Sequence, residues 1–213
     1  MPTPPQFDDA FRTRFRDLLV WRRDVRRFRP DPPPDGTLDR LIELACLAPS
    51  VGLSQPWRFV VVDDPDRRRA VRENFRDCNE EALAAYDEET AGRYAKLKLE
   101  GLEAAPLHLA VFADPATDTG RGVGRRTMPE TVEYSVVTAI HTMWLAARAE
   151  GLGVGWISIL EPARMAADLD VPSDWNFVGY FCIGYPLAED EVPELARAGW
   201  EQRADPGTFI TRR

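Results

Sequence analysis

The sequence is poor in the residues that build disulfide frameworks and metal centres. Its 213 residues include three cysteines and two histidines. Cys46, Cys78 and Cys182 lie far apart among apolar or helical neighbours, which predicts reduced thiols rather than a disulfide framework. His108 and His141 have no cysteine or second histidine at ligand spacing, so we expect no metal site.

Other absences limit where the protein works. No apolar run approaches the length that crosses a bilayer, and residues 1–6 lack the basic start and the apolar stretch of a secretory signal. Acidic residues outnumber basic ones by 35 to 27, and the net charge of −8 would repel a nucleic acid backbone. We therefore expect one cytoplasmic domain over residues 1–213, with neither nucleic acid nor membrane as a partner.

Positive charge is concentrated in residues 21–30. This stretch has five arginines and one carboxylate, Asp24, held between aromatic residues. Planar guanidinium groups match phosphate oxygens, so arginines at the end of a helix can clamp a phosphate monoester. Asp24 among cations would stay ionised and could accept a proton. Taken alone, the stretch fits a solvated helix end with one internal ion pair better than a binding site.

Hydrophobic periodicity predicts helices alternating with short strands. Helical patterns cover about 9–20, 38–45, 65–102, 127–150 and a short segment from 161. Strand patterns cover 58–62, 108–113, 151–160 and 175–185. Thr127 and Glu130 stand at capping-box spacing, which predicts that the fourth helix begins there. Its apolar stripe, widened by Val137 and Trp144, indicates a helix buried in the core or in a dimer.

Three segments offer groups to a ligand. Residues 50–57 form a turn-rich loop with hydroxyl, amide and backbone donors. The glycine-rich turn of residues 151–155 would let a flat ligand approach the backbone, and Ser158 adds a hydroxyl. The charged segment of about residues 86–104 is either a mobile lid over a site or a solvated helical insertion.

Three motifs together resemble the nitroreductase-like flavoprotein superfamily, and the resemblance covers nearly the whole chain. They are Arg22-Arg-Asp-Val-Arg26, Ala48-Pro-Ser50 with Gln55-Pro-Trp57, and Glu150-Gly-Leu-Gly-Val-Gly155. The resemblance implies an α+β fold with a central, mostly antiparallel sheet of four to five strands flanked by helices. It also implies a homodimer that binds FMN at the subunit interface, with the phosphate on the N-terminal arginines.

Two positions depart from ordinary nitroreductases. The chain has Asp24 where the arginine motif commonly has serine, and Leu53 where the following loop commonly has asparagine. In this it resembles the branch of the superfamily that consumes reduced FMN and dioxygen and releases 5,6-dimethylbenzimidazole, the lower ligand of vitamin B12, with erythrose 4-phosphate. A separate flavin reductase is then implied as the source of reduced FMN. The flavin-binding residues implied by the resemblance are Arg22, Arg23, Asp24, Val25, Arg26, Ser50, Leu99 and Ser158.

Asp24 and Ser158 are the expected catalytic residues. Fragmenting the flavin needs protons moved at defined places, and Asp24 is the natural base. The alternative for Asp24 is a plain ion pair with Arg26 or Arg27, and Ser158 could merely satisfy a neighbouring carbonyl. Arg203 in the tail could reach a partner's phosphate, although a solvated arginine is the simpler interpretation.

Two other functions stay open from the residues. One is an NAD(P)H-dependent FMN nitroreductase or flavin reductase, which keeps its FMN through turnover. The other is a flavin-binding protein without turnover of its own.

Overall fold

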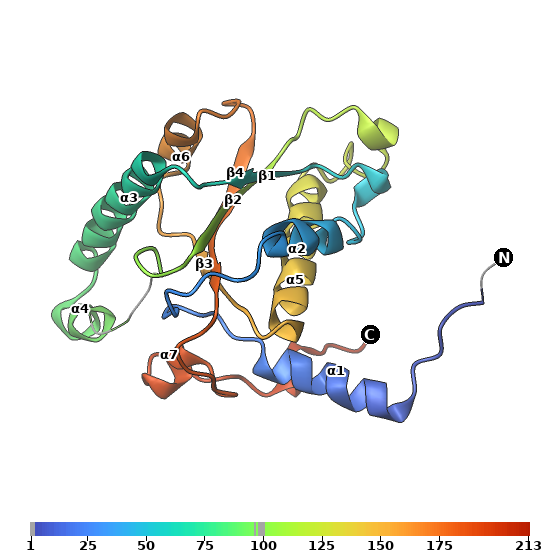
Figure 1. Cartoon of the computed structure of the whole chain (residues 1–213), viewed down its shortest axis with the longest axis horizontal. Helices are drawn as coiled ribbons and strands as arrows, with labels where there is room; N and C mark the ends of the chain where they lie inside the picture. The colour runs from blue at the N-terminus through green and yellow to red at the C-terminus, as the bar shows by residue number, and fades with distance from the viewer. Residues whose placement is uncertain (1–2, 96, 98–100) are drawn as a thin grey trace.

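The computed structural model describes residues 3–95, 97 and 101–213. Its centre is a four-stranded sheet in the order β1-β2-β4-β3, and every pairing is antiparallel (Figure 1). The strands are β1 (Trp57–Val61), β2 (Leu107–Ala113), β3 (Gly153–Ile157) and β4 (Asn176–Gly184). The predicted α+β class is confirmed, and each strand lies within a few residues of its predicted position.

Helices cover both faces of the sheet (Figure 1). The helices on one face are α2 (Thr37–Ala45) and α5 (Thr131–Ala149), and those on the other are α3 (Pro65–Ala84) and α6 (Pro162–Leu169). Along β2, Leu109 and Val111 enter the core beneath α2 and α5, whereas Ala110 and Phe112 enter the core beneath α3 and α6. The chain's own side chains thus fill both faces of the sheet, so ligand groups have to come from its margins.

The predicted apolar stripe of α5 is confirmed. Its buried members are Val132, Val136, Ala139, Ile140, Met143, Trp144 and Ala147. Val137 does not widen this stripe, because it is 38% exposed, and Tyr134 beside it is 56% exposed. The helix therefore also presents apolar groups on its outer side.

The predicted capping box at the start of this helix is wrong. The helix begins at Thr131, and Glu130 makes no side-chain capping bond. The hydroxyl of Thr127 instead donates to the carbonyl of Gly124 at 3.2 Å. Residues 124–130 form turns, with the amide of Met128 bonded to Gly124 and that of Thr131 bonded to Met128, so helical geometry is delayed.

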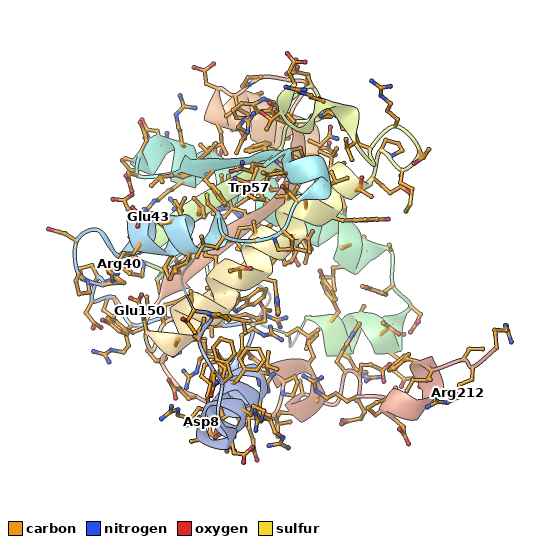
Figure 2. All side chains as sticks on the ribbon, turned by 90° about the vertical axis from the view of Figure 1, so that its right-hand side faces the viewer. Asp8, Arg40, Glu43, Trp57, Glu150 and Arg212 are labelled. Atoms are coloured by element: carbon orange, nitrogen blue, oxygen red, sulfur yellow. The ribbon has the colours of Figure 1, made fainter. Side chains whose placement is uncertain are left out.

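The remaining elements lie around this three-layered body. They are α1 (Asp9–Trp21), α4 (Glu88–Tyr94), α7 (Glu194–Arg197) and the short 3₁₀ turns η1 (Val51–Leu53), η2 (Thr119–Gly122) and η3 (Pro206–Phe209). No residue of α1 is buried. Residues 201–213 are exposed throughout, and Arg212 lies at the outer end of this tail (Figure 2). Within the described residues, no helix has the length and apolarity that a membrane crossing demands.

Candidate functional site

The arginine stretch leaves α1 at Arg22 and runs along the edge strand β3. The amide of Val25 bonds to the carbonyl of Val154 at 3.0 Å, and Asp24 forms a parallel bridge with the same residue. A Cβ on Gly155 would stand 2.2 Å from the carbonyl oxygen of Val25, and one on Gly153 would stand 2.6 Å from its Cγ2. We expected these glycines to admit a flat ligand. Within this chain, both make room for Val25 instead.

Asp24 is held at both carboxylate oxygens. The main-chain N–H of Trp156 donates to Oδ1 at 2.9 Å, and Nε of Arg26 donates to Oδ2 at 2.9 Å. The predicted ion pair with Arg26 is therefore present, whereas Arg27 pairs with Glu194 at 3.4 Å. Burial raises the pKa of the Asp24 carboxyl, because desolvation outweighs the stabilisation of the charge by Arg26 and Trp156.

A cavity of about 220 Å³ opens beside this stretch and is rich in arginine. Arg22, Arg23, Arg26 and Arg203 line it, together with the carboxylates of Asp24 and Glu194. Arg26 pairs with Asp24, which leaves Arg22, Arg23 and Arg203. Burial lowers the pKa of Arg22 and of Arg23, and the charge of Arg203 lowers both further. Among the described residues, no carboxylate forms an ion pair with any of the three. The buried Nε of Arg23 also has no hydrogen-bond partner there. Asp24 raises the pKa of Arg22, and Asp190 and Glu191 raise that of Arg23, but burial outweighs these charges. Partly desolvated guanidinium groups without a direct ion pair fit a phosphate group.

Arg203 is the residue for which the sequence favours a solvated side chain over a binding role. No local motif marks it, and contacts of the residues just before it hold the tail in place. Arg93 of α4 donates to the carbonyls of Gly199 and Trp200, and the rings of Tyr86, Tyr94 and Trp200 lie 5.1 to 6.2 Å apart. The described part of the predicted lid segment thus contacts the chain just before Arg203.

The other predicted site residues are not gathered at this cavity. Ser158 is exposed and follows the end of β3, two residues beyond Trp156. The hydroxyl of Ser50 accepts the N–H of Gln55 at 3.1 Å. Its loop is fixed to the start of α5, because Ser135 accepts the N–H of Val51 at 3.0 Å. Leu99 lies outside the described residues.

The two halves of the predicted site lie toward opposite ends of α5. Ser135 contacts the Ser50 loop, whereas Trp144 contacts the arginine stretch through the carbonyl of Arg23 at 3.1 Å. At a rise of about 1.5 Å per residue, these two positions are roughly 14 Å apart along the helix. One small pocket of a single chain does not contain both.

The fold agrees with comparisons to known proteins. Residues 19–185 match the Nitroreductase family, and the chain belongs to that family. A solved structure of iodotyrosine deiodinase bound to FMN and 3-iodo-L-tyrosine has the same fold, with a TM-score of 0.69 and 23% identity. That alignment covers 82% of this chain and 91% of the deiodinase chain.

Curated relatives define the branch within the family. The chain is 58% identical over 203 residues to the 5,6-dimethylbenzimidazole synthase of Rhodospirillum rubrum, covering 95% of this chain and 96% of that protein. It is 47% identical over 196 residues to a protein of the same name from Rhodobacter capsulatus, covering 92% and 95%. The chain is thus a member of the 5,6-dimethylbenzimidazole synthase branch.

Proposed function

We propose that the protein fragments reduced FMN with dioxygen to form 5,6-dimethylbenzimidazole, the lower ligand of vitamin B12, and releases erythrose 4-phosphate. The observation that carries this proposal is the 58% identity to a 5,6-dimethylbenzimidazole synthase along nearly the whole length of both chains. The site supports it in two ways. Its arginine-lined cavity suits the phosphate of FMN, and it places a carboxylate with a raised pKa beside that cavity.

Arg22, Arg23 and Arg203 would hold the phosphate, because none of the three forms an ion pair with a carboxylate within the described residues. Val25, Ser50, Ser158 and Leu99 are the proposed contacts of the flavin ring. Reduced FMN supplies the electrons that activate dioxygen and the ring carbons of the product. Arg26 has a different task in this scheme, since it pairs with Asp24.

Asp24 is the proposed proton-transfer group. A raised pKa brings a carboxyl closer to the pH at which it must both take up and release a proton. The bonds from Trp156 and Arg26 fix its position against the edge of β3. Ser158, exposed just beyond that strand, is the proposed second group, which hydrogen-bonds the ring or passes a proton.

The proposal includes a homodimer in the cytoplasm, supplied with reduced FMN by a separate flavin reductase. Two exposed apolar surfaces support the dimer. One lies on α1 and the other on the outer side of α5, and their residues are Phe11, Phe15, Leu19, Trp21, Tyr134 and Val137. The separation of Ser50 from the arginines along α5 also supports it, because a partner could bring the two halves of a site together. The segment of residues 86–104 is the proposed lid.

A conventional NAD(P)H-dependent reductase is the second candidate. It is supported by a relative from Thermus thermophilus named NADH dehydrogenase, which is 30% identical over 79% of this chain and 84% of that protein. Exposing the protein to excess reduced FMN in air separates the two functions. The proposed activity converts flavin into a benzimidazole, whereas the reductase leaves the flavin intact and oxidises NAD(P)H when that is supplied. Intact flavin without either change would indicate flavin binding alone.

A further inference from the structure

Trp144 contacts two of the three arginines of the proposed phosphate site. It lies near the C-terminal end of α5 and is 8% exposed. Its indole Nε1 donates to the carbonyl oxygen of Arg23 at 3.1 Å. The guanidinium carbon of Arg22 lies 4.8 Å from the centre of its ring, which is the geometry of a cation–π contact.

The contacts of Trp144 compensate for weak local structure in the arginine stretch. Helix α1 ends at Trp21, and the backbone of Arg22 after it is extended. Beyond it, the backbone bonds to β3 through Val25. Between these points the indole N–H holds the peptide of Arg23, and the indole face replaces part of the water that Arg22 loses on burial. A tryptophan supplies both functions at once, since phenylalanine has no N–H donor.

A second indole supports the first. The rings of Trp144 and Trp156 lie 6.3 Å apart, and the ring of Trp156 lies 5.2 Å from that of Phe181 in β4. The main-chain N–H of Trp156 is the one that binds Asp24. The two tryptophans therefore connect the arginine stretch and its carboxylate to the sheet.

We infer that Trp144 is a positioning residue for the phosphate of FMN, acting through Arg22 and Arg23. By sequence it is only a member of an apolar helix face, and burial alone would explain its type. The two contacts described above give it a second task, which is to fix the main chain at Arg23 and the guanidinium group of Arg22 beside the same cavity. The inference rests on the flavin site of the proposed function, but it does not require the fragmentation reaction.

Trp144→Phe tests this inference by keeping an aromatic face and removing the N–H. We expect FMN to bind about threefold to tenfold more weakly, the size of one net hydrogen bond, while riboflavin binding is unchanged. Calorimetric titration of the flavin-free protein with each flavin measures both affinities. Trp175→Phe is the matched control, because Arg58 stacks on that ring at 5.7 Å on a different part of the sheet. It should leave the ratio of FMN to riboflavin affinity as in the parent protein.

A second variant separates positioning from a general loss of packing. In an Arg22→Ala/Arg23→Ala background, Trp144→Phe should weaken FMN by less than about twofold, because both guanidinium groups that it positions are gone. Equal losses for FMN and riboflavin, or a full loss that persists without Arg22 and Arg23, would overturn the inference. A parent protein that binds FMN but forms no benzimidazole would refute the proposed function only. The affinity ratio would still decide the role of Trp144.

Discussion

Replacing Asp24 with asparagine should separate flavin binding from chemistry. In the parent protein its two oxygens accept the N–H of Trp156 and the Nε of Arg26, each at 2.9 Å. Asparagine has one acceptor oxygen, so its amide group would face one of these two donors. We expect the variant to lose about 1–3 kcal/mol of unfolding free energy, the usual cost of leaving such a partner unsatisfied.

The effect on chemistry should be much larger. An asparagine cannot take up a proton at neutral pH, and a missing general base typically slows a reaction by roughly 10²–10⁴-fold. FMN should still bind, because Arg22, Arg23 and Arg203 keep their charges and a nearby negative charge is removed. Reduced FMN should then reoxidise in air to intact FMN and hydrogen peroxide, with only traces of benzimidazole.

Asp114→Asn is a matched control for this experiment. Asp114 accepts the main-chain N–H of Ala116 at 3.0 Å and pairs with Arg58 at 2.5 Å, away from the arginine stretch. The control should lose a similar unfolding free energy and keep the parental rate. Chromatography after one aerobic exposure measures the products, and thermal unfolding measures stability. A parental rate in the Asp24 variant, or equal rate losses in both variants, would show that Asp24 serves only as an ion-pair partner.

Three further predictions concern binding, assembly and pH. Arg203→Ala should weaken FMN about tenfold to hundredfold in calorimetry without affecting riboflavin, and equal losses would indicate a collapsed site instead. Val137→Glu places a charge on the outer face of α5 and should give a monomer in light scattering that binds no FMN; a stable dimer would exclude this face as the interface. Burial lowers the pKa of His108 to about 4, below its ordinary value of 6.5, so stability present above pH 6.5 is lost as the pH falls toward 4. Denaturant unfolding should show about 2 kcal/mol of this loss between pH 7 and pH 5, and His108→Gln, unlike His141→Gln at an exposed position, should remove it.

Periodicity was sufficient to place the sheet and the main helices, because their apolar faces are regular. The buried stripe of α5 is an example. The capping box predicted from the spacing of Thr127 and Glu130 is wrong. The hydroxyl of Thr127 donates to Gly124 in a turn, which spacing alone does not reveal. The glycines of β3 indicate that something approaches the backbone closely there. The sequence does not show whether a ligand or another segment of the chain fills that space. Here Val25, from a segment more than a hundred residues away, occupies that space.

The candidate site was predictable only where its residues are adjacent in the sequence. Arg22, Arg23 and Asp24 share one short stretch, so their grouping follows directly. Arg203 joins them through tertiary contacts of the tail, such as that of Trp200 with α4, which have no sequence signature. The contacts of Trp144 with Arg22 and Arg23 have no sequence signature either, because they depend on where the arginine stretch lies against α5.

In the proposed function, reduced FMN is consumed as a substrate and does not survive turnover. The most direct measurement uses reduced FMN labelled with ¹³C in the dimethylbenzene ring, mixed with the protein and air, followed by mass spectrometry of the small molecules. We expect labelled 5,6-dimethylbenzimidazole, unlabelled erythrose 4-phosphate in equal amount, and a matching loss of flavin. Complete recovery of labelled FMN, with no labelled benzimidazole, would contradict it.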